Sequence, residues 1–293
     1  MCDEATITEW ARKGLNRRQF GVLGGMAAVA ACAPASGDAS DNAITLPAMS
    51  ERMVEFATPD GTMDGFFVAP ASNPVPSVIL WPDIAGLREA KRDMARRLAG
   101  RGYATLVVNP YYRDRKGQIW EDFADFAGNG GWNIARAMRG KLNAETVMRD
   151  ATAAVAWLEA QKEVDTRRGI GTQGYCMGGP FTFWTAAAVP ARVRAAGSFH
   201  GGGLVKPDDA MSPHKLVGET KANFLVAISQ DDDAEAPGDK TALREAFAAS
   251  GHTATVEVFP ADHGWCVPDS PAYNEVEAEK AWTKLLAMYG AAL

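Results

Sequence analysis

The chain lacks the sequence patterns of several common classes of protein. Its 293 residues include four cysteines and four histidines, with neither a zinc-type Cys/His spacing nor a disulfide framework. Lys and Arg number 30 against 36 Asp and Glu, which gives a formal net charge of −6. No basic block is long enough to indicate binding to duplex nucleic acid, and there is no internal repeat. With 47% hydrophobic and 23% charged residues, the composition predicts one large globular α/β domain, or at most two domains.

The first forty residues differ from the rest. Residues 21–31 are uncharged, small and apolar, but this stretch is shorter than the roughly 20 residues that span a bilayer. Arg17 and Arg18 precede it, and basic residues before a short apolar stretch are typical of an export signal. The pattern resembles a twin-arginine leader. Residues 29–32 resemble a lipobox that would acylate Cys32, and the alternative is cleavage at a nearby site such as residues 33–35.

These patterns divide the chain into an export signal (1–32), a polar tether of small residues (33–49) and a folded domain (50–293). We therefore expect an exported protein that is periplasmic or anchored to the membrane as a lipoprotein through Cys32.

In the folded domain, strand and helix patterns alternate after an opening hairpin. The hairpin is predicted from β-favouring runs at 53–57 and 65–69 around the turn signal Pro59-Asp60-Gly61. Further strands are predicted at 77–81, 103–108, 195–199, 223–229 and 255–259, and helices at 87–98, 147–158, 241–249 and 273–289. This order predicts a doubly wound, mostly parallel sheet with helices on both faces. Ligands of such sheets bind outside the C-terminal ends of the strands.

Residues 111–142 form a long, aromatic-rich excursion between predicted elements. Its aromatic residues are Tyr111, Tyr112, Trp120, Phe123, Phe126 and Trp132. Long loops in compact domains are often functional, so we expect a partial cap over the strand ends. The alternative is a surface loop with a helix that packs its own aromatic side chains.

Residues 174–178 read Gly-Tyr-Cys-Met-Gly, which is the pattern of a nucleophile elbow. In such an elbow the chain leaves a strand, turns sharply and enters a helix, with the nucleophile exposed at the turn. The preceding segment, 166–173, would supply the strand. Glycines on both sides are needed because a side chain there would clash in so tight a turn. Cys176 is therefore a candidate nucleophile, against the alternative of a buried core cysteine.

A candidate base and candidate acids follow the elbow in the order found in α/β-hydrolases. His263 comes directly after the predicted strand at 255–259, and Asp231, Asp232 and Asp233 come directly after the strand at 223–229. A carboxylate there would orient the imidazole and stabilise its charged form. His200 begins a His-Gly-Gly-Gly string, and we interpret this string as backbone that lines the floor of the pocket.

The three residue types together suit thiolate chemistry. An unperturbed Cys is mostly a thiol at neutral pH, because its pKa is around 8.5. A nearby imidazolium and the N-terminus of the helix behind the elbow both favour the thiolate of Cys176. His263 would accept and return the proton.

With these motifs in place, residues 50–293 resemble the dienelactone hydrolase family, α/β-hydrolases with a Cys-His-Asp triad. Residues 174–179 carry its most specific motif. The resemblance implies nucleophile Cys176, base His263 and an acid four residues before a proline. Asp233 has this spacing from Pro237 and is therefore favoured over its two neighbours.

The resemblance also implies the supporting residues of the site. A thiol-activating acid would be Asp83, where the best-known members have Glu. The oxyanion hole would consist of the backbone N–H groups of Ile84 and Met177, and Arg113 would bind a substrate carboxylate. The residue after the base is often Ser in the family and is Gly264 here. Neither a metal nor another cofactor is implied.

The leading hypothesis is an exported hydrolase that cleaves a carboxylic ester or lactone through an acyl-cysteine intermediate. The alternatives are a promiscuous carboxylesterase, a catalytically silent exported binding lipoprotein, and a redox protein that uses Cys176 and Cys266. We expect a monomer whose partner is a small-molecule ester or lactone. It would not bind nucleic acid, and it would meet the membrane only through the leader or a lipid anchor.

Overall fold

The computed structural model describes residues 48–71 and 73–293. The predicted export signal, its Arg17–Arg18 pair, the acylation site Cys32 and nearly all of the tether lie outside these residues. In the described part of the chain, no helix is both long enough and apolar enough to cross a membrane.

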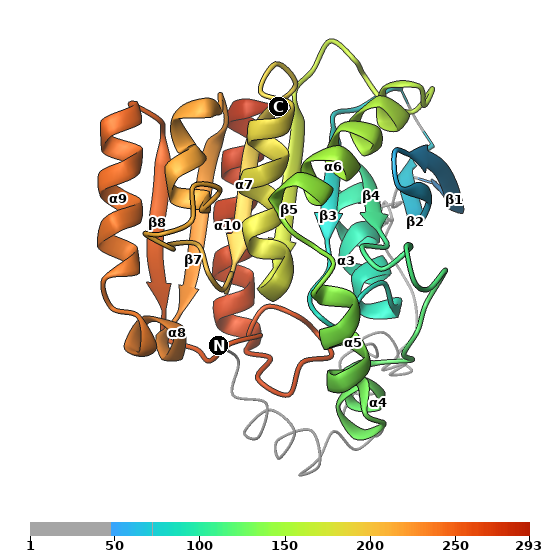
Figure 1. The fold of residues 1–293 in the computed structure, drawn as a ribbon. Coiled ribbons are helices and arrows are strands. Elements are labelled where there is room, and N and C mark those ends of the chain that lie inside the picture. Colours follow the sequence, from blue (N-terminus) through green and yellow to red (C-terminus); the bar gives the residue numbers. More distant parts are fainter. Residues whose placement is uncertain (1–47, 72) are drawn as a thin grey trace, which may run out of the picture.

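One eight-stranded sheet forms the centre of the domain (Figure 1), with strand order β1-β2-β4-β3-β5-β6-β7-β8. The strands are β1 (Met49–Thr58), β2 (Gly61–Pro70), β3 (Ser77–Trp81), β4 (Ala104–Val108), β5 (Ile170–Tyr175), β6 (Val193–Phe199), β7 (Asn223–Ser229) and β8 (Ala254–Phe259). The pairs β1–β2 and β2–β4 are antiparallel, and the other neighbours are parallel. The predicted hairpin and mostly parallel sheet are confirmed.

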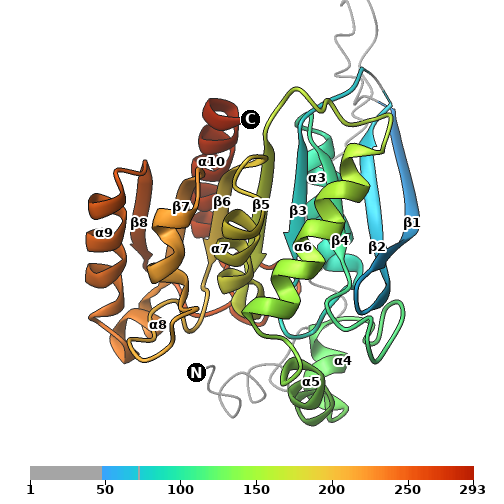
Figure 2. The ribbon, with the colours of Figure 1, turned by 45° about the horizontal axis from the view of Figure 1, so that its top comes forward.

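Helices cover both faces of this sheet (Figure 2). The α-helices are α3 (Glu89–Ala99), α4 (Phe123–Gly128), α5 (Gly131–Arg139), α6 (Ala144–Glu159), α7 (Gly179–Ala188), α8 (Gln230–Glu235), α9 (Asp239–Ser250) and α10 (Glu275–Ala292), and the 3₁₀ turns are η1 (Cys176–Gly178) and η2 (Pro213–Glu219). Buried side chains of α6, α7 and α9 belong to one hydrophobic core, and those of α3 and α10 belong to the other.

Strand β3 shows why a continuous apolar run forms a central strand here. Successive side chains of a strand point to opposite faces. Ile79 and Trp81 accordingly enter one core, whereas Val78 and Leu80 enter the other. All four are fully buried, as expected for a strand covered by helices on both faces.

The excursion at 111–142 contains the two short helices α4 and α5, which lie at the end of the sheet to which the parallel strands point (Figure 1). Phe126 is fully buried and its ring centroid lies 5.0 Å from that of Trp120, 5.3 Å from that of Phe123 and 4.7 Å from that of Trp132. The segment therefore packs its own aromatic side chains, as the alternative interpretation had it. It also lies where a cap would lie.

Candidate active site

Cys176 stands at the turn between β5 and α7. Its φ of 51° falls in the left-handed region that non-glycine residues rarely adopt, and such strain is typical of functional sites. The neighbouring glycines leave no room for a side chain: a Cβ on Gly174 would lie 1.9 Å from the Gly178 carbonyl oxygen, and one on Gly179 would lie 2.4 Å from the Cα of Gly201. Close backbone packing therefore holds the thiol of Cys176 at the strand end.

Two carboxylates from the chain that follows β7 hold His263, one through its imidazole ring and one through its backbone N–H. Its Nδ1 lies 2.8 Å from Oδ2 of Asp232. Its backbone N–H donates to both carboxylate oxygens of Asp231, at 2.9 and 3.1 Å. Oδ2 of Asp232 also accepts a hydrogen bond from the Ser229 hydroxyl at 2.5 Å. Ring and backbone of His263 are thus fixed by adjacent carboxylates.

The structure corrects the choice among the three aspartates. Asp233, which its spacing from Pro237 favoured, pairs with Lys240 at 2.7 Å and not with His263. The three residues lie in the first turn of α8, where successive side chains point about 100° apart because the helix has 3.6 residues per turn. Spacing to a proline counts residues but does not encode this direction. Asp232 therefore takes the position predicted for Asp233, and Asp231 contacts the backbone of His263 instead of its ring.

Cys176 and His263 form a hydrogen-bonded pair. Burial disfavours a charged imidazole, but the negative charge of Cys176 and the hydrogen bond to Asp232 outweigh it, so the pKa of His263 lies well above its usual range. Burial likewise opposes the charged form of Asp232, yet the hydrogen bond from His263 holds its pKa below the usual value. The arrangement favours a thiolate–imidazolium pair backed by a carboxylate.

His200 contributes its side chain and not only its backbone, which corrects the sequence interpretation. The residue is 1% exposed and has a φ of 39°. Its ring centroid lies 4.6 Å from that of His263 and 5.3 Å from that of Trp265. Burial, and next the charge on His263, lower the pKa of His200 well below its usual range, so the ring is neutral. The sequence pattern that could have identified the role of this side chain is the position of His200 directly after a predicted strand, which is also the position of the elbow that carries Cys176.

Asp83 lies in the same pocket but its carboxylate is bound to two buried cations. Arg88 donates to both of its oxygens, at 2.7 and 3.0 Å, and Nζ of Lys91 lies 2.7 Å from Oδ2. Oδ1 also accepts from the backbone N–H of Ala85 at 3.0 Å. Although burial alone would raise it, the two cations hold the pKa of Asp83 well below its usual range. A role in thiol activation finds no support in this geometry.

Arg88 also joins this loop to the loop that carries His263. Its Nε and Nη2 donate to the carboxylate of Asp269, at 2.6 and 2.8 Å. Asp269 in turn accepts from the backbone N–H of Phe123, at the start of α4, at 3.0 Å. Sequence reasoning identified none of this network, because its members are up to 181 residues apart and carry no local pattern.

Arg113 does not lie at the thiol, so the predicted carboxylate-binding role is not supported. Its guanidinium pairs with Asp150 at 2.8 Å and with Asp60 at 2.6 Å. These two carboxylates already neutralise it. Tyr111, two residues earlier, contacts both residues of the predicted oxyanion hole at atoms other than their N–H groups: its hydroxyl donates to the Ile84 carbonyl oxygen at 2.8 Å and to Sδ of Met177 at 3.3 Å.

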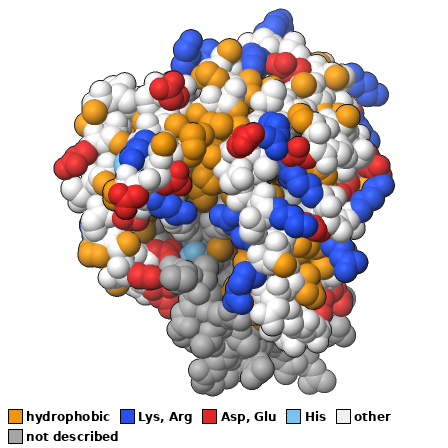
Figure 3. Space-filling view, viewed as in Figure 1, with side chains coloured by type: hydrophobic (Ala, Val, Ile, Leu, Met, Phe, Trp, Pro, Cys, Tyr) orange, Lys and Arg blue, Asp and Glu red, His pale blue; other side chains and the backbone are white. Residues whose placement is uncertain are grey.

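The site pocket is a narrow cavity around the thiol. Its lining residues are Asp83, Ile84, Phe123, Trp132, Cys176, His200, His263, Gly264, Val267 and Ser270. Phe123 and Trp132 come from the excursion, which therefore does form part of the pocket wall. On the surface, a hollow with a histidine side chain inside is flanked by Lys and Arg side chains (Figure 3).

The residue after the base is Gly264, which has a φ of +100°. The Ser expected here from the family resemblance would adopt this conformation only under strain.

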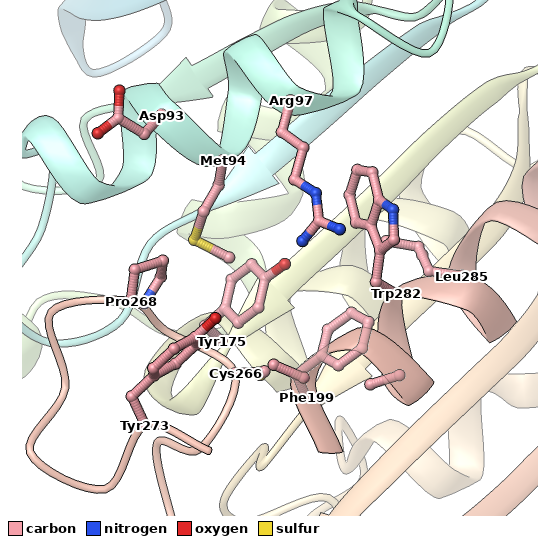
Figure 4. A pocket seen from close by; sticks show the side chains of 12 residues that line it. Asp93, Met94, Arg97, Tyr175, Phe199, Cys266, Pro268, Tyr273, Trp282 and Leu285 are labelled. Atoms are coloured by element: carbon pink, nitrogen blue, oxygen red, sulfur yellow. The ribbon is translucent and has the colours of Figure 1, made fainter. Parts of the chain in front are cut away.

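A second cavity, here called the rear pocket, lies between α3 and α10. Figure 4 shows Met94 and Arg97 pointing from α3 towards Tyr175 and Trp282.

The two cysteines of the domain lie in different pockets. Cys266 lines the rear pocket, whereas Cys176 lines the site pocket. Within the described residues neither cysteine takes part in a disulfide, contrary to the redox interpretation.

The buried network predicts a large effect of Asp83→Asn on stability. An amide cannot neutralise Arg88 and Lys91, and removing one partner of a buried pair costs about 3–5 kcal/mol. The pKa of Asp83 is lowered, so its contribution is complete above the pKa of an unfolded Asp, about 4, and is lost only in more acid solution. Urea unfolding at neutral pH should show this loss. The exposed control Asp208→Asn should stay within about 0.5 kcal/mol of wild type, and equal effects of the two variants would contradict the network.

The pairing of His263 predicts how Cys176 reacts with iodoacetamide. Asp232→Asn removes the charge that stabilises the imidazolium, so the thiolate beside it should form only at higher pH. The pH profile of Cys176 alkylation should therefore move upwards. Asp233→Asn, which alters only the pair with Lys240, is the matched control and should leave the profile in place. The assignment fails if the control moves the profile and Asp232→Asn does not.

Comparisons with known proteins bear on the family and the fold. The model of the dienelactone hydrolase family matches residues 63–293. A protein of Methylorubrum extorquens, named provisionally as a carboxymethylenebutenolidase, is 29% identical over 237 residues, covering 79% of this chain and 78% of that protein. A provisionally named Escherichia coli carboxymethylenebutenolidase is 25% identical over 248 residues, covering 84% of each.

Solved structures show the same fold. A Klebsiella pneumoniae protein provisionally titled a dienelactone hydrolase superposes with a TM-score of 0.70 at 24% identity, over 83% of this chain and 99% of that chain. A dienelactone hydrolase-like promiscuous phosphotriesterase from metagenomic libraries has a TM-score of 0.65 at 25% identity, over 84% of this chain and 99% of that chain. The predicted α/β-hydrolase fold is confirmed, and because the family model matches most of the sequence, the chain belongs to the dienelactone hydrolase family.

Proposed function

We propose that this protein hydrolyses a carboxylic ester or lactone through an acyl-cysteine intermediate, with Cys176 as nucleophile, His263 as base and acid, and Asp232 as the carboxylate that orients the base. The observation that carries the proposal is the continuous hydrogen-bonded line from the strained Cys176 through His263 to Asp232. Such a line activates a thiol and fixes the imidazole in one tautomer.

In the acylation step, Sγ of Cys176 attacks the carbonyl carbon and the carbonyl oxygen becomes an oxyanion. We assign the stabilisation of this charge to the backbone N–H groups of Ile84 and Met177, and one such donor typically contributes roughly 3–4 kcal/mol. Tyr111 links these two residues, because its hydroxyl contacts the Ile84 carbonyl oxygen and Sδ of Met177. When the C–O bond breaks, His263 donates its proton to the leaving alkoxide, which stays attached to the acyl group if the substrate is a lactone.

In the deacylation step, a water molecule attacks the thioester carbonyl while His263 takes one of its protons. The C–S bond then breaks, the carboxylic acid leaves, and the thiolate–imidazolium pair is restored. Asp232 stabilises the imidazolium in both steps. The proton that His263 donates in the acylation step is thus replaced by one from water in the deacylation step.

The lining of the site pocket supports a carboxylesterase of broad range as the second candidate. Within the described residues the lining includes the apolar side chains of Phe123 and Trp132 and no Lys or Arg, and Arg113 pairs with two carboxylates elsewhere. Lys and Arg side chains flank the hollow on the surface (Figure 3), and the charge of Arg139 acts on Cys176. An acidic lactone is therefore not disfavoured, and the substrate panel has to contain both neutral and acidic compounds.

Substitution of the nucleophile tests the reaction. Cys176→Ala should abolish hydrolysis of a panel of neutral and acidic aryl esters and lactones while the free energy of unfolding stays close to that of wild type, because the thiol forms the covalent bond. Cys266→Ala, a control in the rear pocket, should retain turnover. Full activity in Cys176→Ala would refute the mechanism. An inactive wild type across the panel would instead favour a binding protein.

We also propose that residues 1–32 direct export, with attachment to the membrane if Cys32 is acylated. The support is the sequence pattern alone, namely the Arg17–Arg18 pair before a short apolar stretch. Replacing both arginines by lysine should reduce export, measured by cell fractionation. The control is Lys13→Arg, which exchanges one basic residue for another outside the Arg17–Arg18 pair and should leave export unchanged. Undiminished export of the double-lysine variant would contradict a twin-arginine route, and mass spectrometry of the mature N-terminus would reveal acylation.

A further inference from the structure

Three potential metal ligands meet in the site pocket. Sγ of Cys176, a ring nitrogen of His200 and a ring nitrogen of His263 all lie within 4.8 Å of one another. They come from the turns that follow β5, β6 and β8, three strands of one parallel array. The sheet therefore brings one sulfur and two nitrogens together at its C-terminal edge.

His263 is oriented as a histidine ligand would be. Its Nδ1 is engaged by Asp232 at 2.8 Å, which leaves Nε2 as the nitrogen directed towards Cys176. Histidine ligands of zinc commonly have the other ring nitrogen bonded to a carboxylate, which fixes the ring and raises its basicity. The pairing that serves general-base catalysis therefore also prepares the ring to bind a metal.

His200 supplies an independent indication of a ligand. It is 1% exposed, and within the described part of the chain neither of its ring nitrogens has a hydrogen-bond partner. A buried polar group without a partner destabilises the fold, so a ligand for these nitrogens would remove a cost. Its ring neighbours Tyr175, His263 and Trp265 pack against it without forming a hydrogen bond. The proposed hydrolytic cycle needs only one imidazole, so it does not account for this second ring.

We propose that Cys176, His200 and His263 bind a zinc ion, and that the zinc-bound protein is a reversibly inhibited form of the hydrolase. One thiolate and two imidazoles are a ligand set that suits zinc, with the fourth position of the tetrahedron open to the pocket. A sulfur–nitrogen set disfavours magnesium and calcium, which prefer oxygen ligands.

The geometry requires only small adjustments. Zinc bonds of about 2.0–2.3 Å place the ligand atoms of a tetrahedral site about 3.5 Å apart. The three ligand atoms lie within 4.8 Å of one another, so side-chain movements of the order of 1 Å would bring them to this separation. On binding, the proton shared by the thiol–imidazole pair is released to solvent, and the sulfur lone pair that would attack a carbonyl is donated to the metal. Inhibition follows because the nucleophile and the base are both occupied.

Cobalt provides a direct test, because Co²⁺ takes the same ligands and reports a thiolate by its charge-transfer absorption. Reduced, metal-free protein titrated with CoCl₂ should bind one equivalent, with a sulfur-to-cobalt band and the d–d absorption of a tetrahedral ion. ZnCl₂ should displace the cobalt. Absence of the charge-transfer band in wild type, or its persistence in Cys176→Ser, would overturn the proposal.

The decisive variant is His200→Asn, because Asn tolerates the left-handed backbone at this position better than most residues. It should weaken zinc affinity, measured by calorimetry, at least tenfold, and His200→Phe should do the same if it folds. Asp232→Asn should cost about 10–100-fold, the usual effect of losing a ligand's hydrogen-bond partner. Cys266→Ser and His252→Gln, outside the cluster, are controls that should leave affinity unchanged. Unchanged affinity in both His200 variants would overturn the three-ligand site.

Inhibition is measured separately from binding. Zinc should suppress ester hydrolysis by the wild-type protein, EDTA should restore it, and inhibition of the residual activity of His200→Asn should need at least tenfold more zinc. Zinc binding without inhibition would refute the inhibited form. The cobalt spectrum does not depend on turnover, so failure of the proposed hydrolase function and failure of the metal site give different results.

Discussion

A single buried guanidinium, that of Arg88, holds together the three segments that surround the thiol. It bonds Asp83, whose loop carries Ile84, and Asp269, whose loop follows His263. Asp269 then reaches the backbone of Phe123 in the excursion. Because these contacts are buried and charged, loss of one partner leaves the others uncompensated. The pocket wall is therefore a cooperative unit and not a set of independent loops.

Around this unit, the reacting side chains are positioned by backbone conformation. Cys176 and His200 both have positive φ, and each follows the end of a parallel strand. The sheet hydrogen bonds fix the strands, and the close approach of Gly179 to Gly201 locks the two turns against each other. Strain at both residues is tolerated because the neighbouring packing determines their conformation.

The sequence was most informative where function depends on local pattern. The strands at 77–81 and 223–229 were predicted to the residue, and the elbow and the loop of His263 were found from short motifs. The sequence was least informative about the direction in which side chains point and about contacts between residues far apart in the chain. Asp232 and Asp233 differ only in where α8 points them, and Arg113 keeps its place in sequence while its charge is taken up by Asp60 and Asp150. Pairings across the chain, such as Arg88 with Asp269, leave no signal in a single sequence.

The rear pocket bears on how the enzyme could be altered by design. Its wall residues Tyr175 and Phe199 end β5 and β6 and are the immediate chain neighbours of Cys176 and His200. The two cavities therefore share two chain segments while sharing no side chain. A volume change at Tyr175 or Phe199 is expected to reach the backbone of Cys176 or His200, whereas Cys266 belongs to neither segment. These two aromatic positions are thus a route to tune turnover without touching a side chain that lines the site pocket.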